Sequence, residues 1–404
     1  MSEPETYTPR DEISDRISTL QAVLAEENID GALILQSSDL FYFSGTSQQA
    51  HLYIPADGDP VLMVRKDIER AVQESPIKNT VPLKSPRTIP HILKENAVPL
   101  PQRIGMELDV LPVNHYFNFQ AVFGDAEIRD ISQRIRLIRA VKSPYEISLI
   151  REAARMSDEV ASAVPEMLRP GISEIELAGL VEAKARSLGH QGITRMRLWG
   201  AELFYGHVMA GPSASVPSYL ASPTGGPGVS PVVAQGPGFR KVKENEPVLV
   251  DFVFAYRGYL SDHTRIFAIN GLPDEFLAAQ AAMLEIQSLI KKEAKPGVPS
   301  GSLYDMAVQR ATDLGYADHF MGAGDSRIRF VGHGVGIELD EYPFLAKGQD
   351  LPLEAGMAVA LEPKVIFPGQ GVVGIENTHI VTGDGLEQLG KFNEEINIVS
   401  AASA

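Results

Sequence analysis

The stretch VLVDFVFAYRGYLSDHTRIF, residues 248–267, joins two strand-like runs through Arg257-Gly258. Apolar runs on either side of a two-residue turn predict a β-hairpin. In that register Asp251 and Asp262 lie on one face as diagonal neighbours, with backbones roughly 7–8 Å apart. Strands seldom carry aspartate, and two like charges this close repel unless a cation lies between them. The hairpin therefore predicts a cation-binding site.

The stretch MAVALEPKVIFPGQGVVGIENTHIV, residues 357–381, predicts a second hairpin, which carries glutamates. A five-residue turn over residues 367–371 would place Glu362 directly opposite Glu376. A four-residue turn would place them on opposite faces unless a bulge intervened. Because proline cannot donate a hydrogen bond to a neighbouring strand, Pro363 favours an irregular or edge position, and the register stays open.

The stretch VGHGVGIELDE, residues 331–341, holds a histidine between two glycines. A lone histidine is more often structural, but these glycines remove side-chain bulk and let the imidazole approach a crowded site. The four carboxylates of the two hairpins need about two divalent cations to neutralise them. The sequence therefore predicts a metal centre with the ligands Asp251, Asp262, His333, Glu362 and Glu376.

The composition limits the partners and the chemistry of the chain. Its 404 residues suggest two domains, and an apolar content of 44% is ample for globular folding. A formal charge of −16 argues against nucleic acid or a membrane surface as the main partner. No stretch predicts a membrane helix and the N-terminus is acidic and polar, so we expect a cytoplasmic protein. Because the sequence contains no cysteine, a metal ion must be held by imidazole and carboxylate.

The first part of the chain alternates helix-like and strand-like patterns. Residues 12–136 contain an amphipathic run, the strand-like GALILQ, and HLYIPADGDPVLMV with a turn at Asp57-Gly58. This alternation predicts a compact α/β domain. A capping box at Ser143 and Glu146 then begins a long helix. The expected domains, in an α/β (α+β) fold, are residues 1–137 and 138–404.

The second part contains an internal repeat. Residues 169–189, RPGISEIELAGLVEAKARSLG, and residues 295–315, KPGVPSGSLYDMAVQRATDLG, both run from a basic residue and Pro-Gly through a Ser-initiated helix to Leu-Gly. Each follows another helix and precedes strand-like sequence, which favours a duplicated unit over two unrelated helices that share common caps. A pseudo-two-fold domain of this kind would place its functional residues at the seam between its halves.

Between the repeats lies a long stretch, residues 211–240, in which 17 of 30 residues are Gly, Pro or Ser. A loop of this length inside a folded domain is usually functional or disordered. No change of domain follows it, so a lid or substrate loop is favoured over a linker. The aromatic residues before the loop, Trp199, Phe204 and Tyr205, are expected in the core or in a pocket wall.

The five candidate ligands, in the contexts LVDFVF, YLSDHTR, GHGVG, ALEP and GIENT, closely resemble the ligand set of the methionine aminopeptidase, prolidase and Xaa-Pro aminopeptidase family. The two aspartates are 11 residues apart and the two glutamates 14 residues apart, and these spacings resemble those of its prolidase branch. The resemblance covers most of the chain. It implies a creatinase-type N-terminal domain over residues 12–136 and a duplicated, pseudo-two-fold pita-bread catalytic domain over residues 138–398.

By this resemblance Asp251 would chelate one metal ion, His333 and Glu362 the other, and Asp262 and Glu376 would bridge the two. Two cations roughly 3.5–4 Å apart lower the pKa of a shared water and polarise the carbonyl that it attacks. Glu362 would be the general base and acid that passes a proton to the leaving nitrogen. Oxygen-rich ligation favours two manganese ions, with iron, cobalt or zinc as alternatives. Family members are commonly dimers, which implies a homodimer.

Two histidines that this resemblance leads us to expect are missing. Peptidases of the family usually have a histidine seven residues after the ligand histidine, where it contacts the scissile amide, and here that residue is Asp340. They usually have another shortly before the first aspartate, and none lies there. Asp340 could accept a hydrogen bond, pair with a cationic substrate group, or act as a neutral acid. His207 could reach the site from another direction or be simply exposed, and Arg265 could orient a ligand carboxylate or lie on the surface.

The leading hypothesis is a metal-dependent hydrolase that cleaves the C–N bond of a small peptide with proline beside the cleaved bond. The missing histidines motivate an alternative, hydrolysis of a small non-peptide amide or ring, as in creatinase-like and ectoine-hydrolase-like relatives. A non-catalytic pita-bread binding protein is a third hypothesis, and it is weaker because all five ligands are present.

Overall fold

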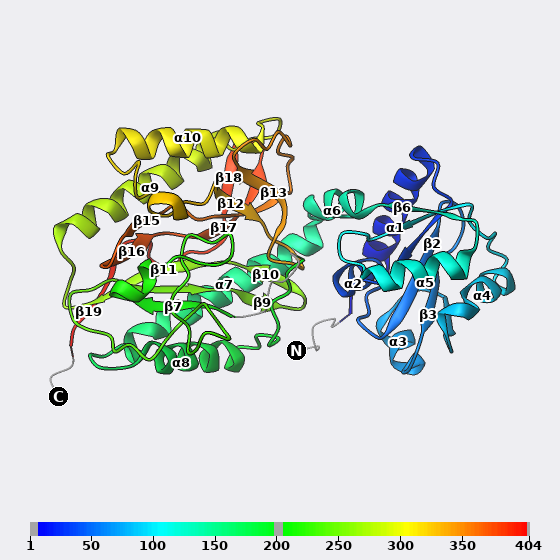
Figure 1. Ribbon diagram of the computed structural model, residues 1–404, viewed down its shortest axis with the longest axis horizontal. Helices are drawn as coiled ribbons and strands as arrows, with labels where there is room; N and C mark the ends of the chain where they lie inside the picture. Colours follow the sequence, from blue (N-terminus) through cyan, green and yellow to red (C-terminus); the bar gives the residue numbers. More distant parts are fainter. Residues whose placement is uncertain (1–6, 198–204, 402–404) are drawn as a thin grey trace. The chain divides into compact units, whose positions relative to one another are not determined.

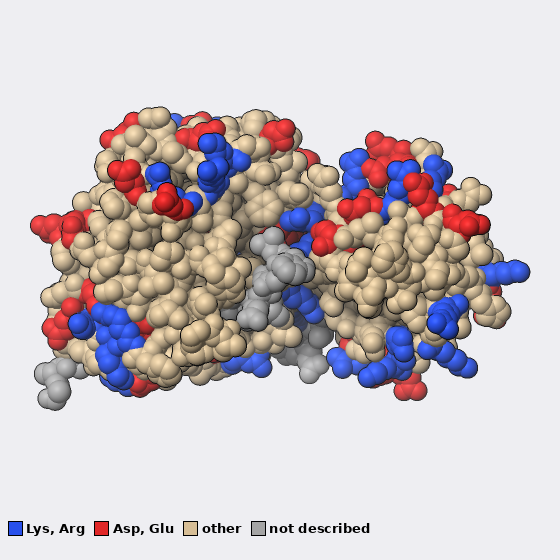
Figure 2. Space-filling view, viewed as in Figure 1, with Lys and Arg blue, Asp and Glu red and all other residues tan. Residues whose placement is uncertain are grey.

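The chain divides after Arg139 into two units, Met1–Arg139 and Ala140–Ala404, each with its own helices and strands (Figure 1). The computed structural model describes residues 7–197 and 205–401. Within these ranges no helix has the length and apolar character needed to cross a membrane. On the face shown in Figure 2, side chains of both charge signs are scattered over each unit.

The first unit is built on a six-stranded sheet in the order β4-β3-β2-β1-β5-β6. β1, β2 and β3 pair antiparallel, with the predicted Asp57-Gly58 turn between β2 and β3, and the outer three strands run parallel to their neighbours. Every residue of β1 and β3 is buried, as expected for strands covered on both faces. The elements are α1 (Arg10–Glu26), β1 (Gly31–Ile34), α2 (Ser37–Ser44), β2 (Ala50–Pro55), β3 (Val61–Val64), α3 (Ile68–Glu74), β4 (Asn79–Pro82), η1 (Pro86–Thr88), α4 (Ile89–Glu95), β5 (Arg103–Met106), α5 (Val113–Phe123), β6 (Glu127–Asp130) and α6 (Ser132–Ala140).

The second unit contains two helix pairs, each followed in the chain by strands of its own sheet. Helices α7 (Pro144–Met167) and α8 (Glu174–Ser187) precede most of the sheet β19-β11-β8-β7. Helices α9 (Asp274–Glu293) and α10 (Ser300–Asp313) precede the sheet β13-β12-β14-β17-β18. In Figure 1, α9 and α10 lie above the strands and α8 lies below them.

The strands of this unit are β7 (Gly206–Ala210), β8 (Val248–Phe252), β9 (Phe254–Tyr256), β10 (Tyr259–Ser261), β11 (Thr264–Ile269), β12 (Phe330–Gly334), β13 (Glu341–Ala346), β14 (Ala358–Leu361), β15 (Lys364–Phe367), β16 (Gly371–Gly374), β17 (Asn377–Thr382), β18 (Gly385–Gln388) and β19 (Asn397–Val399). Strands β9 and β10, and β15 and β16, form separate two-stranded ribbons. Short 3-10 helices follow β7 and precede β12, η2 (Gly211–Ser215) and η3 (Gly324–Ser326).

The two repeated sequences occupy matching places, as α8 and α10. The C-cap of each helix is a leucine, and the next residue is a glycine with positive φ, Gly189 at 101° and Gly315 at 86°. Only glycine adopts this conformation without strain, so it provides a firm helix stop. Their starts differ slightly, because Ser173 is the N-cap of α8 whereas Pro299 takes that position before α10.

The first predicted hairpin forms in the expected register, with Thr264 opposite Asp251. The second hairpin resolves the open register in favour of the five-residue turn. Phe367 pairs with Gly371, and the same register continues where Leu361 pairs with Asn377, so Glu362 lies level with Glu376.

In the part of the chain that the structure describes, one isolated β-bridge joins the sheets of the two halves. Thr264 and Glu376 exchange backbone hydrogen bonds, at 3.2 and 3.4 Å, across the gap between β11 and β17. This bridge aligns a row of residues, since His207 pairs with Asp251 and Asp251 pairs with Thr264. The seam therefore carries acidic residues from both halves at one level.

The predicted capping box is present at the start of α7. The Ser143 hydroxyl accepts a hydrogen bond from the Glu146 N–H at 3.2 Å, and the Glu146 carboxylate accepts one from the Ser143 N–H at 3.0 Å. Glu146 also accepts a hydrogen bond from the Tyr259 hydroxyl at 3.0 Å. The cap thus ties α7 to the ribbon that precedes Asp262.

Replacing Ser143 by alanine should lower the free energy of unfolding of the second unit by about 1 kcal/mol, because the Glu146 N–H loses its acceptor. Urea unfolding followed by the fluorescence of Trp199, the only tryptophan, measures this. The control is Ser148→Ala, at an exposed position of the same helix, which should stay within about 0.5 kcal/mol. Equal losses in both variants would contradict the role of the cap.

Candidate metal centre

The five side chains predicted as metal ligands line one cavity of about 470 Å³ in the second unit. This volume is typical of a small-molecule site. His207 and Asp340 line the same cavity, as do Leu220, Ser222 and Gln235 of the Gly-, Pro- and Ser-rich loop. The loop therefore forms part of the cavity wall.

Three of these acidic residues lie at breaks between strands. Asp262 lies between β10 and β11, Glu362 between β14 and β15, and Glu376 between β16 and β17. At each break the chain passes between a sheet and a two-stranded ribbon. Pro363, which cannot donate to a ladder, accounts for the break beside Glu362. All three side chains are buried and reach the cavity.

The distances between the polar atoms suit a bound cation. The Nε2 atom of His333 lies 3.9 Å from Asp262 Oδ2 and 3.8 Å from Glu362 Oε1. Asp262, His333 and Glu376 each offer an atom within 4.8 Å of the other two. Ligands that surround one divalent ion at about 2.0–2.2 Å have such separations. The Oε1 atom of Glu376 is buried without a hydrogen-bond partner, which a cation would supply.

Burial and mutual repulsion disfavour the charged forms of Asp262 and Glu376. Burial and the neighbouring Asp251 raise the pKa of Asp262 to about 7. Burial and Asp262 raise the pKa of Glu376 well above its ordinary value. A bound cation would reverse both effects, because it stabilises the ionised carboxylates.

One residue of this cluster, Lys364, was missed by the sequence reasoning. Its side chain is fully buried, and its ammonium donates to Glu362 Oε2 and Glu376 Oε2, both at 2.8 Å, and to Asp251 Oδ2 at 3.3 Å. Burial opposes the charge, but the three carboxylates outweigh it and raise the pKa of Lys364 well above its ordinary value. The signal was available, since Lys364 follows Glu362 by two residues and alternate strand residues share a face.

The two substrate candidates are both buried. The alternative in which His207 is exposed is wrong. The side chain is buried, because β7 pairs His207 with Asp251 inside the sheet. Burial lowers the pKa of His207 to about 4, so the imidazole is neutral at pH 7, and its Nδ1 lies 3.1 Å from Thr224 Oγ1 of the loop. Asp340 accepts a hydrogen bond from the Arg197 N–H at 2.8 Å, so it anchors a neighbouring segment as well as lining the cavity.

Comparison with known proteins agrees with this geometry. Residues 148–383, more than half of the chain, match the model of "Metallopeptidase family M24", and residues 16–141 match that of the "Creatinase/Prolidase N-terminal domain". The chain belongs to metallopeptidase family M24. Its function class is therefore that of a metal-dependent hydrolase of peptide bonds, and the expected creatinase-type and pita-bread folds are confirmed.

Among curated relatives, an Xaa-Pro dipeptidase of Pyrococcus furiosus is 27% identical over 388 residues, which cover 95% of this chain and all of the relative. Among solved structures, the Xaa-Pro dipeptidase from Bacillus anthracis has a TM-score of 0.82 at 26% identity, with 96% of this chain and 100% of that chain covered. The X-Pro aminopeptidase from Thermotoga maritima MSB8, at 23% identity and a TM-score of 0.79, covers 95% of this chain and 99% of its own, and shares the fold.

Membership of family M24 implies divalent metal ions, and the donor set fits them in part. Carboxylates and one imidazole are ligands that divalent cations accept. Asp262, His333 and Glu376 offer donor atoms close enough together to hold one ion. Asp251 and Glu362 each give one carboxylate oxygen to the ammonium of Lys364.

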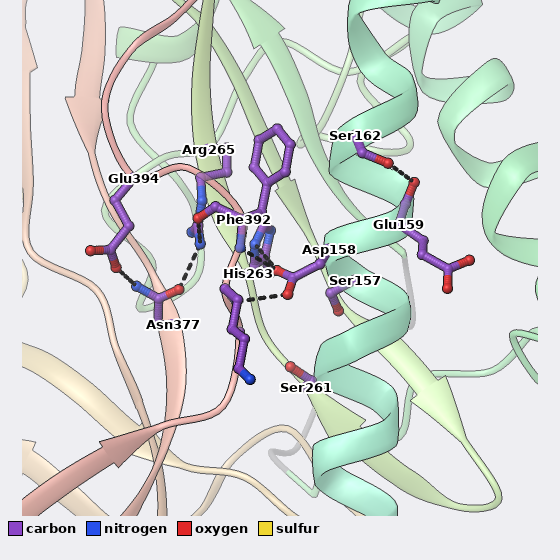
Figure 3. A network of polar contacts seen from close by, with 12 residues as sticks. Ser157, Asp158, Glu159, Ser162, Ser261, His263, Arg265, Asn377, Phe392 and Glu394 are labelled. Carbon is purple, nitrogen blue, oxygen red and sulfur yellow. Dashed lines mark hydrogen bonds and ion pairs between the residues drawn. The ribbon is translucent and has the colours of Figure 1, made fainter.

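Arg265 supports the M24 site through contacts with backbone oxygens and with Asn377 rather than with a ligand carboxylate; Figure 3 shows it beside Asn377. It is fully buried, so the surface alternative is wrong. Its guanidinium donates to the backbone oxygens of Thr264 and Glu376, at 2.9 and 3.0 Å, and to the Asn377 side chain at 2.8 Å. These contacts join β11 to β17 directly beside the seam.

The neighbouring His263 is not among the residues that line the cavity, in agreement with strand alternation. Figure 3 shows it beside Asp158. Its Nε2 lies 3.5 Å from Asp158 of α7. Of the aromatic residues named above, Tyr205 donates a hydrogen bond to the Gly192 oxygen, while Trp199 and Phe204 lie outside the described residues.

Replacing Arg265 by methionine should lower the free energy of unfolding by about 3 kcal/mol, because several buried oxygens lose their donor at once. Chemical denaturation of the second unit measures this loss. Arg155→Met is the control, because Arg155 is exposed on α7 and pairs only with Glu152 and Glu159 among the contacts described, so the cost should stay below about 1 kcal/mol. A similar small cost for Arg265→Met would contradict its supporting role.

Proposed function

We propose that this M24 metallopeptidase hydrolyses small peptides with proline after the cleaved bond, and that Xaa-Pro dipeptides are its main substrates. The observation that carries the proposal is the gathering of four carboxylates and one imidazole around a cavity of about 470 Å³. A cavity of this size accommodates a dipeptide and excludes a folded protein chain. The names of the relatives from Pyrococcus furiosus and Bacillus anthracis point to the same substrate class.

The charge of the cavity wall supports a substrate with a free carboxylate. Two exposed cationic side chains, Arg329 and Lys347, line the cavity together with the acidic cluster. A dipeptide carries its C-terminal carboxylate close to the scissile bond, so these cations can pair with it while the carbonyl lies over the cluster. The C-terminus of a longer peptide would extend beyond this reach.

A bound divalent cation supplies a water of lowered pKa and polarises the scissile carbonyl. The candidate ligands for divalent ions are Asp251, Asp262, His333, Glu362 and Glu376, and two of them, Asp251 and Glu362, also accept the ammonium of Lys364. Glu362 takes up the proton of the water and passes it to the leaving nitrogen. The hydrogen bond from Lys364 to Glu362 Oε2 fixes this carboxylate, so its Oε1 is the oxygen that handles the proton. Arg265 holds the backbone of Glu376 in place.

His207 and Asp340 are proposed to contact the substrate, since both line the cavity. A neutral His207 can donate or accept one hydrogen bond at the substrate backbone. Asp340 lies where the family usually has a histidine, and as a carboxylate it accepts a hydrogen bond from a peptide N–H or from the α-ammonium group. This difference alters substrate selection within the peptidase reaction.

The finer properties of the protein are also proposals. Manganese is favoured because the donors are mostly carboxylate oxygens, and iron, cobalt or zinc remain alternatives. A homodimer in the cytoplasm follows from the resemblance and from the acidic, cysteine-free composition. Hydrolysis of a non-peptide amide or ring, and a purely binding role, are not favoured, because the named relatives are peptidases.

The protein loaded with Mn²⁺ should release free proline from Leu-Pro, with kcat/KM at least about tenfold above that for Leu-Ala. The C-terminal amide of Leu-Pro should be a poorer substrate, because it lacks the charge that Arg329 and Lys347 meet. Chromatographic quantification of proline measures both. Turnover of creatine or a cyclic amide without any peptide hydrolysis would reject the proposal, as would inertness towards every peptide after metal loading.

Asp262→Asn keeps the shape of the side chain and removes its charge, so kcat should fall by about 10³-fold or more. The matched control is Asp313→Asn on the exposed face of α10, which should retain full activity. Circular dichroism establishes that both variants are folded. Full activity of Asp262→Asn would contradict the assignment of this carboxylate.

A further inference from the structure

The ammonium of Lys364 lies among carboxylates that would otherwise need a second cation to neutralise them. It is within 3.3 Å of carboxylate oxygens from Asp251, Glu362 and Glu376. An ammonium has three N–H donors, and these three acceptors satisfy all of them. The three carboxylates come from three separate stretches of the chain, so Lys364 already performs the neutralising role of a cation there.

The path of the lysine side chain is built into the ribbon β15-β16. Lys364 pairs with Gly374, and a Cβ atom at Gly374 would lie 2.7 Å from Lys364 Cγ. Any larger residue at that position would therefore displace the aliphatic stem. The Lys364 oxygen also accepts a hydrogen bond from the Met321 N–H at 2.9 Å, which fixes the backbone on its other side.

Asp262, His333 and Glu376 offer donor atoms close enough together to hold one ion. Of the two Glu376 oxygens, Oε2 accepts hydrogen bonds from Lys364 and Thr264, and Oε1 has no partner among the described residues. A second divalent ion could reach Asp251 and Glu362 only beside the ammonium that already binds one oxygen of each, and the two cations would repel each other.

Lys364 also changes the charge balance of the cluster. Four carboxylates carry four negative charges when ionised. One divalent ion alone would leave two of these charges unbalanced, whereas one divalent ion together with Lys364 leaves one.

We propose that Lys364 acts as a built-in cation which replaces one of the two metal ions that the M24 family implies, so that this chain binds a single divalent ion through Asp262, His333 and Glu376. The inference rests on the proposed function, because it concerns the same centre. It predicts a peptidase with one metal ion, in which the ammonium of Lys364 takes the place of the second cation.

The direct test is metal stoichiometry. Protein loaded with Mn²⁺ and freed of unbound ion is analysed by inductively coupled plasma mass spectrometry. Wild type should hold about one ion per chain and Lys364→Ala about two, because alanine removes the ammonium and opens its space. Lys292→Ala, at an exposed position of α9, is the control and should match wild type.

Electron paramagnetic resonance of the bound Mn²⁺ gives a second readout that does not depend on activity. Wild type should give the signal of an isolated ion, and Lys364→Ala that of a coupled pair. Two ions in wild type, or one ion in both proteins, would overturn the role of Lys364 and leave the proposed peptidase function intact. An absence of metal from every variant would overturn the proposed function itself.

Lys364→Met keeps the variant series informative if Lys364→Ala does not fold, because methionine preserves the buried stem without its charge. In the presence of a chelator, Lys364→Met should unfold at a lower temperature than wild type, since its carboxylates then lack any cation. Added Mn²⁺ should restore most of the difference. Equal thermal stability of the two metal-free proteins would overturn the proposal.

Discussion

The constraint on which the second unit depends is electrostatic. Asp262, Glu362 and Glu376 are buried at the seam between two sheets, and Asp251 lies level with them. Anions removed from water and held this close together are stable only if cations lie among them. The ammonium of Lys364 satisfies part of that need, and we propose that one divalent ion satisfies the rest. The hydrolytic chemistry then uses the same charges that keep the seam together.

The rest of the fold holds these charges in register. The bridge between Thr264 and Glu376 joins the two sheets, and Arg265 secures the bridge through the Glu376 backbone oxygen. The capping box of α7 reaches the ribbon before Asp262 through Glu146 and Tyr259. None of these supporting contacts uses a carboxylate oxygen of Asp262, Glu362 or Glu376, so those oxygens remain available for cations. A site at a seam needs such supports, because no regular ladder crosses it.

Much of this arrangement was predictable because it depends on local patterns. The turn at Arg257-Gly258 fixed the register of the first hairpin, and the capping box fixed the start of α7. The register of the second hairpin stayed open because Pro363 and the glycines near its turn allow two turn lengths. The structure selects the five-residue turn, and with it the alignment of Glu362 and Glu376.

What sequence reasoning missed depends on contacts between distant segments. The spacing of two residues indicates that Lys364 shares a strand face with Glu362, but lysine is usually a surface residue, so the local sequence does not indicate that its ammonium is buried among three carboxylates. The burial of His207 follows from the pairing of β7 with β8, about forty residues apart in the chain. The bond from the Arg197 N–H to Asp340 spans an even longer separation. Such contacts depend on the tertiary fold, and the periodicity of apolar residues in the sequence does not indicate them.

Anomalous X-ray diffraction from crystals of the wild-type protein grown with Mn²⁺ measures most directly how many metal ions each chain binds and where they lie. If Lys364 replaces one metal ion, one anomalous peak per chain is expected within coordination distance of Asp262, His333 and Glu376, with the Lys364 ammonium still bound to Asp251 and Glu362. Two peaks with Lys364 turned away, or no peak among these residues, would contradict this role of Lys364.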